Sequence, residues 1–118
     1  MNVLSKNAIE KEFANFLSYY IKENLGRGPR ETKIKITDNV LVFFMKGILT
    51  PMERNILKSS DGLPIALEAR RLYLKGAGQE RIQAFEKIVG MKIVEHYEAW
   101  KLEEDAAVGV LVFEENIT

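Results

Sequence analysis

The run Val40–Met45 constrains the fold more than any other segment, because all six of its residues are apolar. Successive side chains of a strand point to opposite faces of a sheet, so an uninterrupted apolar run fits a strand that is buried on both faces. We therefore expect Val40–Met45 to be a central strand. A helix, a loop or another subunit would cover its second face, and the sequence leaves these alternatives open.

The residues before this run predict its partner in a hairpin. Lys33–Thr37 alternates polar and apolar residues, which is typical of a strand with one solvated face. Asp38 and Asn39 tolerate positive φ, so we expect them to form the two-residue turn between the strands.

Two short segments set the limits of the first helices. Apolar residues at helical spacing predict a helix over about residues 6–25, and Gly26 is a suitable residue to end it. The segment Thr50-Pro51-Met52-Glu53 fits a capping box, in which the side chains of Thr50 and Glu53 each accept a hydrogen bond from the other's backbone amide. We expect a short helix from Pro51 to about residue 58.

A longer helical stretch is expected from Pro64 to Val89, with Gly90 as the residue that ends it. Gly76 and Gly78 lie inside this stretch, and a glycine in a helix interior costs roughly 1 kcal/mol. A break at these glycines and a continuous helix therefore both stay open. The residues expected to face inward are Ile65, Leu67 or Ala66, Ala69, Leu72, Tyr73, Ile82, Phe85, Ile88 and Val89.

The remaining residues predict two more strands, over about residues 91–98 and 107–113. The resulting order, α-β-β-α-α-β-β, predicts an α+β fold in which a four-stranded, mainly antiparallel sheet carries helices on one face. A chain of 118 residues fits a single domain, covering residues 1–118.

The composition excludes several classes of function. Lys+Arg and Asp+Glu both number 17, so the formal net charge is zero, which argues against a general nucleic-acid binder. The absence of cysteine excludes disulfides, thiolate metal sites and cysteine nucleophiles. The first residues, Met1 to Lys6, form no apolar h-region, so we expect no secretory signal. The longest apolar run is far shorter than the ~20 residues that span a bilayer. We expect a cytoplasmic protein with no membrane span.

One loop carries residues of the kind that bind anions. The turn Gly26-Arg27-Gly28-Pro29 invites such an interpretation, because glycine loops expose backbone amides and arginine pairs with oxyanions. The turn follows a helix, however, and the carbonyls at a helix C-terminus repel anions. It also lacks the Gly-Lys-Ser/Thr of a phosphate-binding loop. We interpret it mainly as a helix stop. The candidates for binding a phosphate ligand or nucleic acid are Arg27, Arg30, Lys33 and Lys35.

No arrangement of residues predicts catalysis. His96 is the only histidine, and Glu95 would point to the opposite face of its strand. A Ser-His-Asp arrangement, a pair of catalytic carboxylates and a dinucleotide fingerprint are all missing. We expect no enzymatic activity, no cofactor and no metal. The residues interpreted as structural are Gly26, Gly28, Pro29, Gly47, Thr50, Glu53, Arg70 and Gly90, while Tyr97 and Trp100 would anchor a partner if they are exposed.

Four features occur in a fixed order along the chain: Gly26-Arg27-Gly28-Pro29, Lys46-Gly47-Ile48-Leu49-Thr50-Pro51-Met52-Glu53, Arg70 and Gly90-Met91-Lys92-Ile93-Val94. In this ordered set the chain resembles the MpsC-like domain family of small bacterial proteins, over essentially its whole length. The family name implies a subunit of a sodium-translocating, membrane-potential-generating system. The family offers no established catalytic residues. For a chain without a membrane span, the resemblance implies an accessory subunit.

These observations lead to two functional hypotheses. The preferred one is a non-enzymatic accessory or interaction protein, which forms a homodimer through its apolar second strand or an exposed helix face. It would associate peripherally with a membrane ion-translocating complex. The alternative is a phosphate-ligand or nucleic-acid-binding module that uses the loop of Arg27 and Arg30.

Overall fold

The computed structural model describes residues 5–26 and 28–117 of the chain. The elements follow the predicted order α-β-β-α-α-β-β, with one additional 3-10 turn before the last strand, so the predicted α+β class is confirmed. They are α1 (Lys6–Leu25), β1 (Glu31–Thr37), β2 (Val40–Lys46), α2 (Pro51–Ile56), α3 (Gly62–Val89), β3 (Ile93–Lys101), η1 (Leu102–Glu104) and β4 (Ala106–Phe113).

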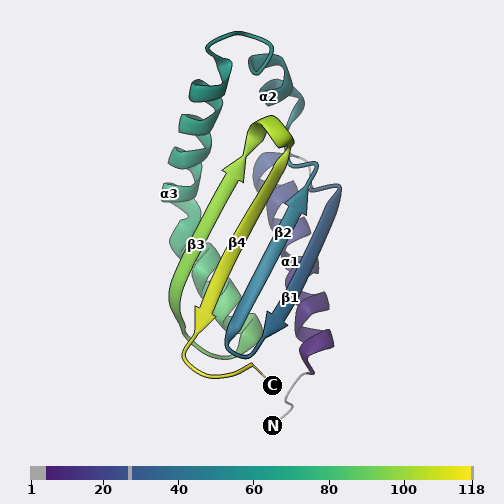
Figure 1. Cartoon of the computed structure of the whole chain (residues 1–118), viewed down its shortest axis with the longest axis vertical. Coiled ribbons are helices and arrows are strands. Elements are labelled where there is room, and N and C mark those ends of the chain that lie inside the picture. The colour runs from purple at the N-terminus through teal and green to yellow at the C-terminus, as the bar shows by residue number, and fades with distance from the viewer. Residues whose placement is uncertain (1–4, 27, 118) are drawn as a thin grey trace.

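The four strands form one sheet in the order β1-β2-β4-β3, and each neighbouring pair is antiparallel. The apolar strand β2 is therefore a central strand, as the sequence predicts. Helices α1 and α3 lie behind the sheet as seen in Figure 1, while the face toward the viewer carries no helix. The predicted four-stranded sheet with helices on one face is confirmed.

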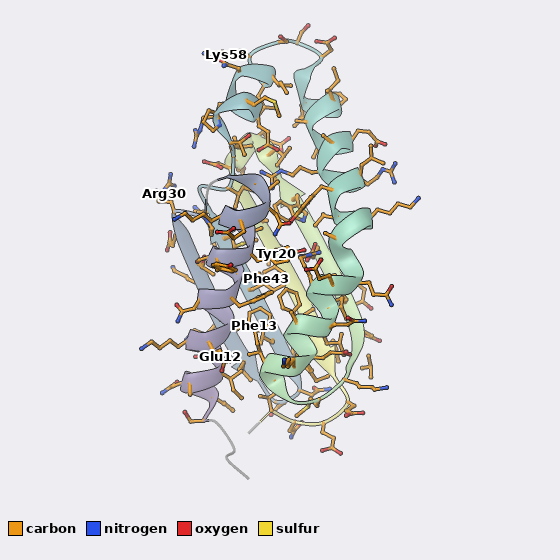
Figure 2. The ribbon with its side chains drawn as sticks, turned by 180° about the vertical axis from the view of Figure 1, so that it is seen from behind. Glu12, Phe13, Tyr20, Arg30, Phe43 and Lys58 are labelled. Atoms are coloured by element: carbon orange, nitrogen blue, oxygen red, sulfur yellow. The ribbon has the colours of Figure 1, made fainter. Side chains whose placement is uncertain are left out.

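The core lies between the sheet and the two long helices, and three phenylalanine rings form its centre (Figure 2). Phe13 of α1 stacks on Phe85 of α3 with ring centroids 4.6 Å apart, and Phe43 of β2 lies 6.0 Å from each of them. Gly109 of β4 makes room for this cluster, because a Cβ atom there would overlap the Phe43 ring. The three rings are fully buried.

Helix α1 has the predicted bounds, and both of its ends are capped. The Ser5 hydroxyl accepts a hydrogen bond from the Ala8 amide at 3.1 Å. At the other end Gly26 adopts φ +82°, and its amide donates to the Lys22 carbonyl at 2.8 Å. The left-handed conformation of this residue favours glycine, which explains why the helix ends here.

Helix α3 is continuous from Gly62 to Val89, which resolves the alternative left open at Gly76 and Gly78. The predicted inward face of its first half is wrong at most positions: of the residues expected there, Ala66 is buried and Tyr73 is half-buried. Ile65 and Leu72 are 56% and 55% exposed, and Leu67 and Ala69 are exposed as well, whereas Ala66 and Arg70 are buried. The buried residues Gly62, Ala66 and Arg70 recur every four residues and form one side of the helix, and Ile65 and Leu72 lie away from this side. Figure 1 also shows that α2 and the first turns of α3 extend beyond the end of the sheet. We call α2 and residues 62–72 of α3 the helical arm.

Several element boundaries differ from the prediction, among them the start of α3, which is Gly62 and not Pro64. Strand β1 begins at Glu31, before the expected Lys33, because Glu31 pairs with Lys46 and the Arg30 amide donates to the Lys46 carbonyl at 2.8 Å. Strand β3 runs from Ile93 to Lys101, later than the expected residues 91–98, since Lys101 still pairs with Ala106. Helix α2 ends at Ile56, two residues before the expected end at residue 58.

Replacing the two glycines inside α3 should stabilise the protein. A Cβ atom at Gly76 or Gly78 would meet no atom within 4 Å. We therefore expect Gly76→Ala and Gly78→Ala each to raise the free energy of unfolding by roughly 0.5–1 kcal/mol, measured by urea denaturation. Gly90→Ala is the matched control and should destabilise the protein, because Gly90 has φ +86°, which is unfavourable for a residue with a Cβ atom. A loss of stability in both α3 variants would contradict a continuous helix.

Candidate functional site

The outer face of the sheet is apolar along its two central strands. Side chains alternate between the faces of each strand, and those that point away from the helices on β2 and β4 are only half-buried. No described helix or loop lies over them in Figure 1. We call this surface the open sheet face. Its apolar centre consists of Val40, Val42 and Phe44 on β2 with Val108, Val110 and Val112 on β4.

The register of the sheet arranges the open sheet face in four rows that run across the strands. The two middle rows are Lys35–Val42–Val110–Tyr97 and Lys33–Phe44–Val108–Ala99. The outer rows are Thr37–Val40–Val112–Glu95 and, at the end next to the helical arm, Glu31–Lys46–Ala106–Lys101. The apolar centre is therefore bordered by charged or polar residues of β1 on one side and by Glu95, Tyr97, Ala99 and Lys101 of β3 on the other, where Tyr97 is 58% exposed.

On each edge of the sheet, one backbone amide is bound by a carboxylate of the protein's own helices. On the β1 edge, the Ile36 amide donates to Glu10 of α1 at 3.0 Å. On the β3 edge, the Ile93 amide donates to Glu86 of α3 at 2.8 Å, and a bulge follows between Ile93 and Glu95. Bulges and occupied edge amides both hinder the addition of a further strand.

Three of the predicted binding residues, Arg30, Lys33 and Lys35, lie in β1 or just before it. Lys33 and Lys35 are exposed on the β1 border of the open sheet face, and the Lys33 ammonium lies 3.3 Å from the Glu31 carboxylate. Arg30 is exposed in the loop before β1, and Arg27 lies outside the described residues. The phosphate or nucleic-acid hypothesis stays a prediction.

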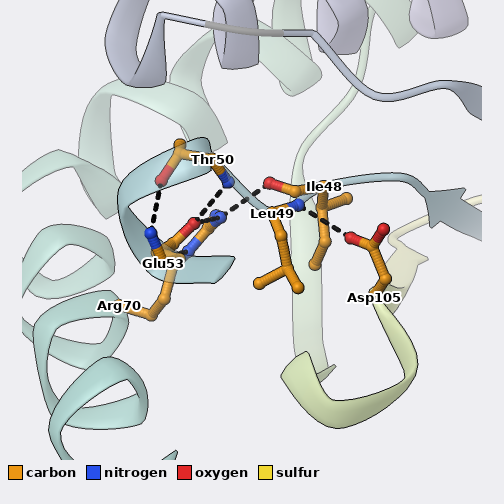
Figure 3. Close-up of polar contacts among 6 residues, drawn as sticks. All are labelled: Ile48, Leu49, Thr50, Glu53, Arg70 and Asp105. Carbon is orange, nitrogen blue, oxygen red and sulfur yellow. Dashed lines mark hydrogen bonds and ion pairs between the residues drawn. The ribbon is translucent and has the colours of Figure 1, made fainter. Parts of the chain in front are cut away.

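A buried ion pair holds the helical arm to the end of β2 (Figure 3). Thr50 and Glu53 form both bonds of the capping box, at 3.2 and 2.9 Å. The Glu53 carboxylate also accepts two hydrogen bonds from Arg70, at 2.6 and 2.7 Å, while Arg70 donates a third to the Ile48 carbonyl at 2.8 Å. Burial raises the pKa of Glu53, but the hydrogen bonds from Arg70 and Thr50 and the charge of Arg70 lower the pKa overall. Glu53 and Arg70 thus fix the arm relative to the sheet.

Asp105 supports the same junction from the β4 side (Figure 3). Its carboxylate accepts from the Leu49 amide at 2.7 Å and from the Arg54 guanidinium at 3.2 Å. Gly47 adopts φ +72°, and a Cβ atom there would overlap Arg30, so this position requires glycine. Sequence reasoning did not identify Asp105, because its partners lie far away in the chain.

A second buried ion pair joins α3 to β3, and sequence reasoning missed it. Arg81 donates to Glu98 at 2.8 and 3.2 Å, and His96 and Trp100 also contact the Glu98 carboxylate, at 3.1 and 3.2 Å. Arg81 follows Arg70 by about three helical turns, which places both on the same face of α3. This spacing was the one sign in the sequence that Arg81, like Arg70, faces the protein. The Trp100 ring also lies 5.0 Å from the Arg70 guanidinium, so it packs inside the protein.

The remaining predicted structural residues lie in the connections between elements. Gly26 and Gly90 are the residues that end α1 and α3. Gly28 and Pro29 lie between α1 and β1, where a Cβ on Gly28 would approach the Ser18 carbonyl to 3.2 Å. Across residues 5–26 and 28–117, no three His, Cys, Asp or Glu side chains lie close enough to hold a metal ion. In the same residues, no helix is long and apolar enough to cross a bilayer.

Comparison with known proteins identifies relatives over most of the chain. The family described as "Na+-translocating membrane potential-generating system (MpsC)" matches residues 5–115. The uncharacterized protein YrhF of Bacillus subtilis (strain 168) is 27% identical over 107 residues, covering 90% of this chain and 88% of YrhF. The uncharacterized protein YbcI of the same organism is 32% identical over 90 residues, covering 75% of this chain and 72% of YbcI. No solved structure gives a significant match.

The Glu98 cluster should make the protein sensitive to acid. Burial opposes ionisation, but hydrogen bonds from His96, Arg81 and Trp100 and the charge of Arg81 hold the pKa of Glu98 at about 2, against 4.5 for an unperturbed glutamate. Because the folded-state pKa is depressed, this stabilisation is complete above about pH 4.5 and is lost as the pH falls toward 2. The free energy of unfolding should fall there by up to about 1.4 kcal/mol per pH unit for this one group.

Urea denaturation between pH 6 and pH 2.5 measures this effect. Glu98→Gln should be less stable than the wild type at pH 6, and the difference should shrink as the pH falls. Glu68→Gln is the control, because Glu68 forms an ion pair with Arg71 on the exposed surface of α3. Equal pH slopes for the wild type and Glu98→Gln would contradict the depressed pKa.

Proposed function

This chain belongs to the MpsC family, and from that premise we propose that it is a non-enzymatic accessory subunit that self-associates through its open sheet face. In this proposal it acts by protein–protein contact on the cytoplasmic side of a membrane ion-translocating system. The open sheet face is the observation that carries the proposal.

The chemistry of this face supports an interface between protein chains. Monomeric proteins rarely expose a large contiguous apolar patch, and patches rimmed by polar residues mark interaction sites. Here six apolar side chains from two neighbouring strands form the centre, and charged residues of β1 and β3 form the rim. A second copy of the chain carries the same apolar centre and would cover it.

The assignment as a non-enzymatic protein is supported by what the polar residues contact. The sole histidine, His96, contacts Glu98, and Glu98 also binds Arg81. Glu53 and Arg70 bind each other and the end of β2. Each of these groups therefore has a partner within the fold, and the Glu98–Arg81 and Glu53–Arg70 pairs tie one element to another.

The link to a membrane system rests on the family description. That description names a Na+-translocating, membrane potential-generating system. A chain of this architecture would take part in such a system as a peripheral component, bound to subunits that themselves cross the membrane.

Self-association through the open sheet face predicts the effect of a charge at its centre. Val110→Lys places an ammonium in the middle of the apolar rows, where it would lose hydration on dimer formation. We expect the wild type to sediment as a dimer and Val110→Lys as a monomer over the same concentration range in analytical ultracentrifugation. The control is Ile65→Lys, on the exposed surface of α3 and away from this face, which should remain dimeric. A wild type that is monomeric at every concentration would overturn the proposed self-association.

The accessory role predicts specific membrane partners. Purification of the tagged chain from cross-linked native cells with membranes included should recover integral membrane subunits of an ion-translocating system, identified by mass spectrometry. The tag alone, expressed in the same cells, is the control. Recovery of soluble proteins only would contradict a place in a membrane complex, and the dimer measurement would stand unaffected.

A further inference from the structure

We propose that two copies stack their open sheet faces about a two-fold axis parallel to the strands, so that both helical arms project from the same end of the dimer. This inference rests on the proposed self-association and adds its geometry. The register of the sheet and the positions of the rim charges decide between the arrangements that two-fold symmetry allows.

Two stacked sheets of one protein have two simple choices of axis in the plane between them. Face-to-face sheets keep their strand directions within about 30° of each other. An axis along the strands reverses the order of the strands, so β1 lies over β3 of the second copy and β2 over β4. An axis across the strands places each strand over the same strand of the second copy. It reverses the order of the rows, so the first row lies over the fourth and the second over the third.

The axis along the strands places the charged residues of β1 over those of β3 in the second copy. It keeps each row over itself, so Glu31 lies over Lys101 of the second copy, and the same pair repeats on the other side. Lys35 lies over Tyr97, whose hydroxyl donates to Glu95 at 3.2 Å, so the Lys35 ammonium meets a carboxylate as well. Each valine or phenylalanine of the β2 centre lies over a valine of β4.

The axis across the strands brings like charges together. It places Lys33 over Lys35 of the second copy, and this pair of ammonium groups occurs twice in the interface. It also brings Lys101 over Glu95, which offsets part of the repulsion. Like charges placed against each other at an interface are strongly unfavourable, and the arrangement along the strands has no such pair among these rows.

The orientation of the arms follows from the chosen axis. The row of Glu31 and Lys101 lies at the end of the sheet where β2 leads into the helical arm (Figure 1). An axis along the strands keeps this end in place, so two arms extend side by side. Each arm presents Ile65 and Leu72, which are more than half exposed. The dimer thus offers two copies of one apolar surface at one end, the arrangement needed to bind a two-fold or repeated partner with avidity.

Distances between spin labels test the geometry directly. The chain contains no cysteine, so each single substitution provides one labelling site per copy. Lys58→Cys labels the tip of the arm, and Glu12→Cys labels α1 toward the other end (Figure 2). The protein is 52 Å long. We expect Lys58–Lys58 and Glu12–Glu12 distances well below this length, because each pair lies at one end of the dimer. An axis across the strands predicts a Lys58–Lys58 distance close to the full length.

Charge reversal tests the pair that fixes the axis. Glu31→Lys and Lys101→Glu should each weaken the dimer by roughly fivefold, since each creates like-charge pairs at the rim. An equimolar mixture of the two variants should recover wild-type affinity, because both opposite-charge pairs are then restored in the heterodimer. The matched control is Glu12→Lys mixed with Lys11→Glu, two exposed positions of α1 outside the interface, which should change neither affinity nor pairing.

The outcomes separate this inference from the proposed function. A wild type that is monomeric throughout overturns the self-association and with it this geometry. A stable dimer whose Lys58–Lys58 distance approaches the length of the molecule, or whose charge-reversed variants fail to rescue each other, overturns the geometry alone.

Discussion

The contact between the Phe43 ring and the backbone at Gly109 is the constraint on which the rest of the structure depends. Only a residue without a Cβ atom leaves room for this ring at the middle of the β2–β4 pair. The ring in turn supports Phe13 and Phe85, one from each long helix. All the large aromatic side chains of the core therefore lie on the helix side of the sheet, and the other side is left with Phe44 and smaller β-branched residues. This contact therefore contributes to the asymmetry of the two faces.

The two buried arginines of α3 explain how such a small core holds a helix much longer than the sheet beneath it. Phe85 anchors the second half of α3 by apolar packing, but the first half extends beyond the sheet. There Arg70 binds Glu53 and the Ile48 carbonyl, and farther along Arg81 binds Glu98. A buried ion pair adds little net stability compared with apolar packing, but loss of one partner leaves a charge unpaired. These ion pairs therefore fix the position of α3 more than they add to the stability of the protein.

Local signals in the sequence predicted most of the fold. Gly26, the box of Thr50 and Glu53, and the alternation of Lys33–Thr37 each act through neighbours in the chain, so element order and most boundaries followed from them. The inward face of α3 could not be predicted in the same way. Its apolar residues at Ile65 and Leu72 fit a core helix locally, but the side of the helix that faces the protein is the one with Ala66 and Arg70, and this depends on tertiary structure. Arg81 and Asp105 were missed for the same reason, since their partners come from distant segments.

The sequence of β2 alone predicted that both faces of this strand need a cover. The apolar run of β2 required some cover for its second face, and the described residues cover only the first. The edges of the sheet are less suited to association, because Glu10 and Glu86 each occupy one edge amide and a bulge distorts β3. A second chain that approached an edge would have to displace these bonds, whereas one that approached the open sheet face would displace only water. In the proposed dimer, the second copy would complete the burial of β2.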